Sequence, residues 1–217
     1  MKFDVGKAKS AQLEIAKRIV REDCFEKLKS VGGLDVSYSR NRAFGVAVLS
    51  ILDYNTRDLL EIKYSYSHVP IPYIPTFLAF REVPLYYPLV KKADVDVILV
   101  DGHGIAHPRG AGVASHVGVV ADKPTIGIAK KRLYGKEGNC DFGQCLFDDN
   151  GNVIAVTLRK NKKELFVSIG HCVSLKSAVE ITKKFLKYGL PEPIRISDTV
   201  SRRLAKSWFG NPWLPKR

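Results

Sequence analysis

The stretch that decides the fold is Val95-Asp96-Val97-Ile98-Leu99-Val100-Asp101-Gly102-His103-Gly104. The run from Val95 to Val100 is short, apolar apart from Asp96 and rich in valine, and it stops abruptly at Asp101-Gly102. Such a run is typical of a strand buried on both faces in the middle of a sheet. Ligands of α/β sheets collect at the carboxyl ends of parallel strands, so we expect Asp101 to lie at a functional site.

Three more segments read as strands ahead of this one, because they are β-rich and bounded by turn residues. They are Val31–Ser37, Gly45–Asp53 and Leu59–Ser67. Their short connections predict antiparallel neighbours. A further strand, Pro124–Ile128, follows the central one, and a polar hairpin then turns at Asp148-Asp149-Asn150-Gly151.

Apolar periodicity predicts helices between and around these strands. They cover Lys7–Leu28, Phe77–Lys92 (interrupted or kinked at Pro84 and Pro88), a segment near Gly112–Val120, Leu175–Tyr188 and Asp198–Trp208. The order is three antiparallel strands, a helix, a strand, a helix and a strand. It predicts an α/β protein with a mixed sheet, three antiparallel strands plus two parallel ones, and helices on both faces. No linker or repeat divides residues 1–217, which we expect to form a single domain.

The chain is strongly basic, with 35 Lys and Arg residues against 22 Asp and Glu residues and a formal net charge of +13. This charge favours a polyanionic partner such as nucleic acid, or it is simply a basic soluble surface. No apolar run reaches the length of a membrane span, and no apolar stretch follows the N-terminal lysines. We therefore expect a cytoplasmic protein without a membrane partner.

Four cysteines, Cys24, Cys140, Cys145 and Cys172, include no Cys-x-x-Cys pair. This pattern argues against a zinc site and against a secreted disulfide framework. Reduced and mostly buried thiols are the default expectation, and a Cys140–Cys145 bridge is the alternative in an unusual redox setting.

Four acidic residues lie in surroundings that do not explain them: Asp35 within a strand, Asp101 at a strand end, Glu82 in an apolar helix and Asp198 at a helix start. Burying a carboxylate is costly unless it is paired or binds a metal. Mg²⁺ takes oxygen ligands, so converging carboxylates predict a site for it. Asp198 is equally well an N-cap and Glu82 an ordinary ion-pair partner, whereas burial favours a function for Asp35 and Asp101.

The loop after Asp101 is rich in glycine and also contains His107. Its backbone amides could approach a phosphate or a base, and His107 could contact a phosphate or orient a water, although a lone histidine is more often structural. The loop lacks the Gly-Lys-Ser/Thr ending of a nucleoside triphosphatase. Lys130 ends the next strand, where it could meet a scissile phosphate or belong to a basic face.

The segment Pro72-Tyr73-Ile74-Pro75 presents an aromatic and an aliphatic side chain on a backbone that its prolines restrict. The pair could be a wedge between stacked bases, or the loop could pack back on the core.

Together these segments closely resemble the endonuclease V family of deoxyinosine-specific nucleases. The resemblance runs from about Val31 to Lys206 and is carried by several motifs in order. They are Gly33-Leu34-Asp35-Val36-Ser37-Tyr38, Pro72-Tyr73-Ile74-Pro75, Phe80-Arg81-Glu82, Asp101-Gly102-His103-Gly104, His107-Pro108-Arg109, Ala114-Ser115-His116 and Gly127-Ile128-Ala129-Lys130.

The resemblance implies a ribonuclease H-like fold and a DNA repair endonuclease. It implies Asp35, Glu82, Asp101 and Asp198 as ligands of Mg²⁺ (or Mn²⁺), with His107 and Lys130 contacting phosphate and assisting the chemistry. By the same resemblance Tyr73 belongs to the strand-separating wedge, and we expect its neighbours Ile74 and Pro75 to contact the nucleic acid as well. Backbone amides near Thr76, Gly102 and Gly104 receive the flipped base. The family cuts the second phosphodiester bond 3′ to deoxyinosine and leaves the base in place.

One position departs from the family, because Thr76 stands where a glycine or another small residue is usual. A β-branched side chain there could narrow the base pocket. The sequence does not decide between inosine in DNA and inosine in RNA, and an inosine-specific endoribonuclease is an alternative. A junction nuclease of the same fold and a non-catalytic nucleic-acid-binding module are two others. We expect a monomer.

Overall fold

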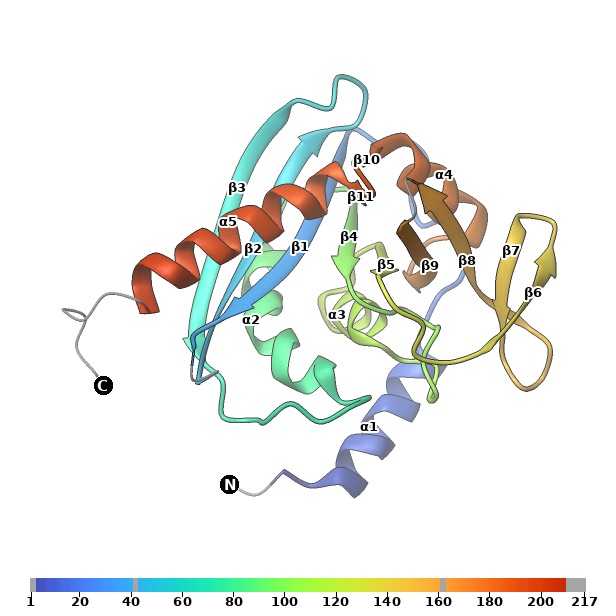
Figure 1. The fold of residues 1–217 in the computed structure, drawn as a ribbon, viewed down its shortest axis with the longest axis horizontal. Coiled ribbons are helices and arrows are strands. Elements are labelled where there is room, and N and C mark those ends of the chain that lie inside the picture. The colour runs from blue at the N-terminus through green and yellow to red at the C-terminus, as the bar shows by residue number, and fades with distance from the viewer. Residues whose placement is uncertain (1–2, 41–42, 161–162, 210–217) are drawn as a thin grey trace.

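A computed structural model describes residues 3–40, 43–160 and 163–209. The described residues form a mixed sheet of nine strands, a separate pair of short strands and five helices (Figure 1). The sheet strands are β1 (Ser30–Tyr38), β2 (Phe44–Asp53), β3 (Leu59–His68), β4 (Val97–Asp101), β5 (Thr125–Ala129), β6 (Lys136–Cys140), β7 (Gly143–Phe147), β8 (Val153–Lys160) and β9 (Lys163–His171). The short pair is β10 (Leu186–Lys187) and β11 (Leu190–Pro191). The helices are α1 (Val5–Lys17), α2 (Leu78–Lys92), α3 (Val113–Ala121), α4 (Leu175–Phe185) and α5 (Glu192–Phe209).

The first five strands have the predicted arrangement. The sheet runs β3-β2-β1-β4-β5-β9-β8-β7-β6. β1 pairs antiparallel with β2, and β2 with β3, whereas β4 lies parallel to both β1 and β5. The run Val97–Val100 is fully buried at the centre of this sheet. The carboxyl ends of β1, β4 and β5 therefore lie at one edge.

The prediction of five strands was incomplete. β9 adds to β5 in the antiparallel direction, and β8, β7 and β6 continue the sheet as an antiparallel meander. The expected turn at Asp148–Gly151 joins β7 to β8. β6 was missed because its side chains are largely exposed and polar, which leaves no apolar alternation to detect.

Helices cover both faces of the sheet, as predicted, and each face has its own core. Leu34, Ile98 and Val100 pack with α2 and α3 on one face. Val97, Leu99 and Ile126 pack with α4 and the start of α5 on the other (Figure 1). α1 lies outside α3, where Ile15 contacts Val119. None of the helices in the described ranges has the length and apolarity needed to cross a membrane.

Three helix predictions need correction. α1 ends at Lys17 instead of Leu28, and the chain beyond it is held by long-range contacts such as Val20 N–H to His171 Nδ1 at 3.2 Å. α2 continues through Pro84 and Pro88, so the interruption that these prolines allowed is absent, whereas the alternative of a kink stays a prediction. α5 begins at Glu192, so Asp198 lies well inside the helix and is not its N-cap.

The expectation of reduced thiols was wrong. Cys24 is bonded to Cys172, and Cys140 is bonded to Cys145 across the β6–β7 hairpin. The second bond is the alternative that the spacing had left open. The first joins residues 148 positions apart and was not visible in the sequence, because only the fold brings the segment after α1 to the end of β9.

Candidate active site

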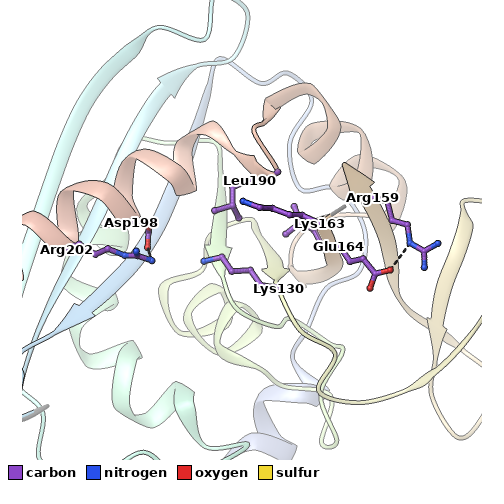
Figure 2. Close-up of a pocket in the computed structure, with 9 residues that line it drawn as sticks. Lys130, Arg159, Lys163, Glu164, Leu190, Asp198 and Arg202 are labelled. Carbon is purple, nitrogen blue, oxygen red and sulfur yellow. Dashed lines mark hydrogen bonds and ion pairs between the residues drawn. The ribbon is translucent and has the colours of Figure 1, made fainter. Parts of the chain in front are cut away.

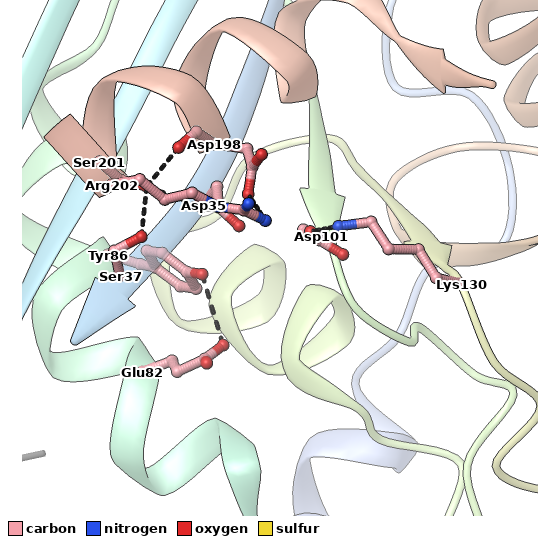
Figure 3. Close-up of polar contacts among 9 residues, drawn as sticks. All are labelled: Asp35, Ser37, Glu82, Tyr86, Asp101, Lys130, Asp198, Ser201 and Arg202. Atoms are coloured by element: carbon pink, nitrogen blue, oxygen red, sulfur yellow. Dashed lines mark hydrogen bonds and ion pairs between the residues drawn. The ribbon is translucent and has the colours of Figure 1, made fainter. Parts of the chain in front are cut away.

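Asp35 and Asp101 lie on neighbouring parallel strands. Leu34 of β1 pairs with Val100 of β4, so the next residue on each strand is one of the two acids. Figure 3 shows both side chains directed into the same hollow at the strand ends. Two carboxylates placed this close repel each other, which makes the spot one where a cation is favoured.

Asp35 is nearly buried and is held by α5. The Ser201 hydroxyl donates to Asp35 Oδ2 at 2.7 Å, and Ser37 Oγ lies 2.8 Å from Ser201 Oγ. Burial, followed by the negative charge of Asp101, raises the pKa of Asp35 to about 7. Ser201 orients the carboxylate but supplies only one of the contacts that a buried charge needs.

Glu82 enters the same site from α2. Its two oxygens accept from the hydroxyl of Tyr38 at 3.1 Å and from that of Tyr86 at 3.4 Å. Burial, with smaller contributions from the charges of Asp35 and Asp101, raises the pKa of Glu82 to about 8, although the hydrogen bonds from the two tyrosines lower it. The surface ion pair that was the alternative for Glu82 is therefore not what the structure contains, because this side chain is buried between tyrosines.

The remaining two acids are each turned toward a cationic side chain. Lys130 Nζ lies 2.5 Å from Asp101 Oδ2, and Arg202 lies 2.7 Å from Asp198 Oδ1 within α5. Partial burial is the largest single effect on the pKa of Lys130 and lowers it. The charge and hydrogen bond of Asp101, together with the charges of Asp35 and Asp198, outweigh burial, so the pKa is raised. Lys130, at the end of β5, thus carries a positive charge beside the acids.

The donor set fits a hard divalent cation. Four carboxylates arrive from β1, β4, α2 and α5, and two of them have pKa values raised by burial. As they stand, no three His, Cys, Asp or Glu side chains of the described residues close on one point tightly enough to hold a metal ion. Lys130 and Arg202 now neutralise two of the acids, and oxygen ligands of this kind suit Mg²⁺ or Mn²⁺.

The proline-rich loop joins β3 to α2 and lies outside both elements. Tyr73 is 59% exposed, and Ile74 is half-buried beside it. The loop is anchored at both ends by Val69 and Phe77, which are buried. Tyr73 therefore does not pack back on the core, and its ring is free to contact a partner.

Thr76 closes this loop in an unusual conformation with a φ of 67°. Its carbonyl oxygen accepts from Gln12 Nε2 at 2.9 Å, from His107 Nε2 at 2.9 Å and from Arg109 at 3.0 Å. Arg109 also donates to Thr76 Oγ1 at 2.6 Å and to Gln12 Oε1 at 2.6 Å. A β-branched residue in the left-handed region is strained, and these bonds hold it there.

His107 is buried, and both its ring nitrogens are engaged within the protein. Nδ1 accepts from the Arg109 amide at 3.2 Å, so Nε2 bears the proton and donates to Thr76. Burial lowers the pKa of His107 to about 4, which keeps the ring neutral. In this arrangement the ring holds the loop, and its contact with a phosphate stays a prediction.

The amides of Gly102 and Gly104 are also occupied, contrary to the prediction that they are open to a base. Gly102 donates to Ile128 O at 3.0 Å and Gly104 to Ser168 Oγ at 2.8 Å. The glycines are needed for packing instead: a Cβ on Gly104 would lie 1.9 Å from Ile169 O. These two amides therefore have partners within the protein, and the base pocket itself stays a prediction.

Several residues of the site were not found from the sequence. Ser201, Tyr86 and Gln12 carry no signal of their own, because serine, tyrosine and glutamine are common on helices. The position of Ser201 three residues after Asp198 would have placed both on one face of a helix. Gln12 and Thr76 are 64 positions apart, and only the tertiary fold joins them.

The sheet order, with one acid within β1, one at the end of β4 and two on the flanking helices, defines a ribonuclease H-like nuclease architecture. The Endonuclease V family model matches residues 13–199. An endonuclease V of Ignicoccus hospitalis is 49% identical over 210 residues, which cover 95% of this chain and 98% of that protein.

Solved structures agree with this match. Endonuclease V of Bacillus subtilis superimposes with a TM-score of 0.87 at 28% identity, over 97% of this chain and 95% of that one. Endonuclease V of Ciona intestinalis, solved with a 24mer DNA containing an inosine followed by a ribo-adenosine, gives 0.84 at 30% identity, over 94% and 98%. The chain belongs to the endonuclease V family, and it is a metal-dependent deoxyribonuclease.

Proposed function

We propose that this chain, acting as a single nuclease domain in the cytoplasm, recognises deoxyinosine in DNA. It then hydrolyses the second phosphodiester bond 3′ to that base and leaves the base in place. The observation that carries the proposal is the convergence of Asp35, Glu82, Asp101 and Asp198 beside Lys130. The inosine-containing DNA bound by the Ciona relative supports the choice of lesion.

The four carboxylates are the residues that would hold Mg²⁺, with Mn²⁺ as a substitute. When bound, a divalent cation supplies Lewis-acid chemistry at water and at phosphate oxygen. Ser201 orients Asp35, and Tyr38 and Tyr86 orient Glu82. Lys130 can exchange Asp101 for a non-bridging phosphate oxygen, where its ammonium offsets the charge that develops during hydrolysis.

Recognition is assigned to the loop that ends at Thr76. Tyr73, with Ile74 and Pro75, would enter the stack where the lesion is extruded, since a mispaired base costs less to flip. The hydrogen bonds from Gln12, His107 and Arg109 fix the base of the loop. His107 accordingly has a positioning role in this proposal.

Nicking of paired duplexes tests the proposed function. Duplexes with and without one inosine are incubated in Mg²⁺ and in EDTA, together with an inosine-containing RNA and a junction without inosine. We expect a Mg²⁺-dependent nick one nucleotide beyond the deoxyinosine. Preferential cutting of the RNA would instead support the endoribonuclease, equal cutting of the junction a structure-specific nuclease, and metal-independent binding without nicking a binding module.

A further inference from the structure

A groove of about 760 Å³ continues from the candidate active site (Figure 2). Lys130 and Asp198 line both the groove and the acid cluster, so the two are contiguous. The rest of its wall comes from β8, β9 and the segment around β11, including Arg159, Lys163 and Leu190. A polymer bound at the acids would have to pass along this wall or leave the protein surface.

The groove is lined predominantly by positive charge. Its cations are Lys130, Arg159, Lys163 and Arg202, and its acids are Asp198 and Glu164. Arg159 is 63% exposed and pairs with Glu164 at 2.7 Å. Exposed pairs of this kind contribute only about 0–1 kcal/mol, so such a cation can turn to a phosphate at small cost.

Lys163 is the cation most available to a ligand. Within the described part of the chain its ammonium makes no ion pair or hydrogen bond. Its aliphatic stem lies on Gly189, where a Cβ would come within 2.6 Å of Lys163 Cδ. Figure 2 shows Lys163 and Lys130 extending toward α5, the helix that carries Asp198 and Arg202.

We propose that this groove binds the sugar–phosphate backbone of the nucleic-acid strand as it runs away from the scissile bond, with Lys163 and Arg159 as phosphate contacts. The inference rests on the proposed function, since it takes the acid cluster as the point of cutting. The lining holds charged and aliphatic residues but no aromatic ring on which a base could stack. Contacts to phosphate alone predict binding that does not depend on sequence or on the lesion.

Equilibrium binding of the full-length protein in EDTA tests the groove without cutting. Each DNA duplex carries either inosine or adenine at one position. Its two arms, the stretches of duplex on either side of that position, are kept at full length or shortened one at a time. One truncation ends immediately beyond the expected nick, and the other ends beside the lesion. Wild type is compared with Lys163→Gln and with Lys176→Gln. Lys176 is an exposed lysine of α4, and its neighbour Ser177 lines a different pocket.

For Lys163→Gln we expect the dependence of log affinity on log salt to become shallower by about 0.9, and affinity to fall about threefold. The loss of affinity caused by Lys163→Gln should be the same for inosine and adenine duplexes. When one of the two arms is removed, it should become as small as the loss caused by Lys176→Gln. Equal behaviour of the two variants, or a loss that persists with either arm removed, would overturn the groove. If Mg²⁺-dependent nicking at inosine fails while the arm-dependent loss remains, the proposed function falls and the groove stands.

Discussion

Gln12 of α1 donates from Nε2 to the carbonyl oxygen of Thr76 at 2.9 Å, although the two residues are 64 positions apart. Gln12 is 1% exposed and also donates to Ala111 O at 3.3 Å. Its Oε1 accepts from Arg109, the residue that binds both oxygens of Thr76. The N-terminal helix therefore fixes the loop that presents Tyr73.

Gln12→Ala should lower the free energy of unfolding by about 1–3 kcal/mol, because it leaves buried partners without hydrogen bonds. It should also reduce the preference for inosine over adenine, since the loop loses its anchor. Denaturant titration and paired binding measurements check the two effects. Glu14→Ala, on the exposed face of the same helix, should change stability by less than about 0.5 kcal/mol. An equal loss in both variants would contradict the anchoring role.

Substitutions at Thr76 separate backbone strain from hydrogen bonding. Thr76→Gly removes the strain at a φ of 67° together with the bond from Arg109 to Oγ1. Thr76→Val loses the same bond and keeps a β-branched side chain. We expect the glycine variant to be more stable than the valine variant by about 1–2 kcal/mol, measured by denaturant titration. Equal stabilities would show that the left-handed backbone costs nothing here.

The central sheet could be predicted because each of its signals is local. The run before Asp101 and the short connections among the first three strands fix burial and direction without knowledge of distant contacts. The end of α1 could not be predicted in this way. The residues after Lys17 keep a helical apolar pattern, but backbone bonds to Cys172 and the Cys24–Cys172 disulfide hold them outside a helix.

The same difference between local signals and distant contacts decides which parts of the candidate site could be predicted. The placing of Asp35 and Asp101 followed from the cost of a carboxylate in a buried strand, and the structure places them side by side. The amides of Gly102 and Gly104 were expected to be open, but hydrogen bonds to β5 and β9 use them. A glycine-rich pattern indicates that another group approaches the backbone closely. It does not show whether that group is a ligand or a neighbouring strand.

Acid should destabilise the protein through its buried histidines. Burial lowers the pKa of His107 and of His116 to about 4, against an ordinary value of 6.5. The unfolded chain then binds more protons than the folded one between these values. Stability from this source is complete above about pH 6.5 and is lost as the pH falls toward 4, by roughly 1.4 kcal/mol per pH unit for each histidine.

His116→Asn should reduce the dependence of the unfolding free energy on pH by the contribution of one histidine. Unfolding free energies measured from pH 7 to pH 4 provide the check. His68 is exposed, and His68→Asn serves as the matched substitution against which the effect of His116→Asn is compared. A slope that is identical in the wild type and in His116→Asn would contradict the assignment.

Tyr73→Ala should weaken binding to a deoxyinosine duplex more than binding to an undamaged one. The ring is exposed, so its removal leaves the core intact, and stacking on a base contributes roughly 1–3 kcal/mol. Tyr73→Phe keeps the ring and should bind as the wild type does. Affinity measurements on the two duplexes decide the matter, and an equal loss on both would refute the wedge.

The most direct test of the central claim is single-turnover cutting of a deoxyinosine duplex in Mg²⁺ by the wild type and by Asp35→Asn, with duplex affinity measured in parallel. Asparagine keeps the size of the side chain and a carbonyl for Ser201 but lacks the charge that a metal ligand needs. We predict a nick by the wild type, at least a thousandfold slower cutting by the variant as an order-of-magnitude expectation (about 4 kcal/mol of barrier), and nearly unchanged binding. Cutting by Asp35→Asn at a rate close to that of the wild type would remove Asp35 from the metal site and contradict the account.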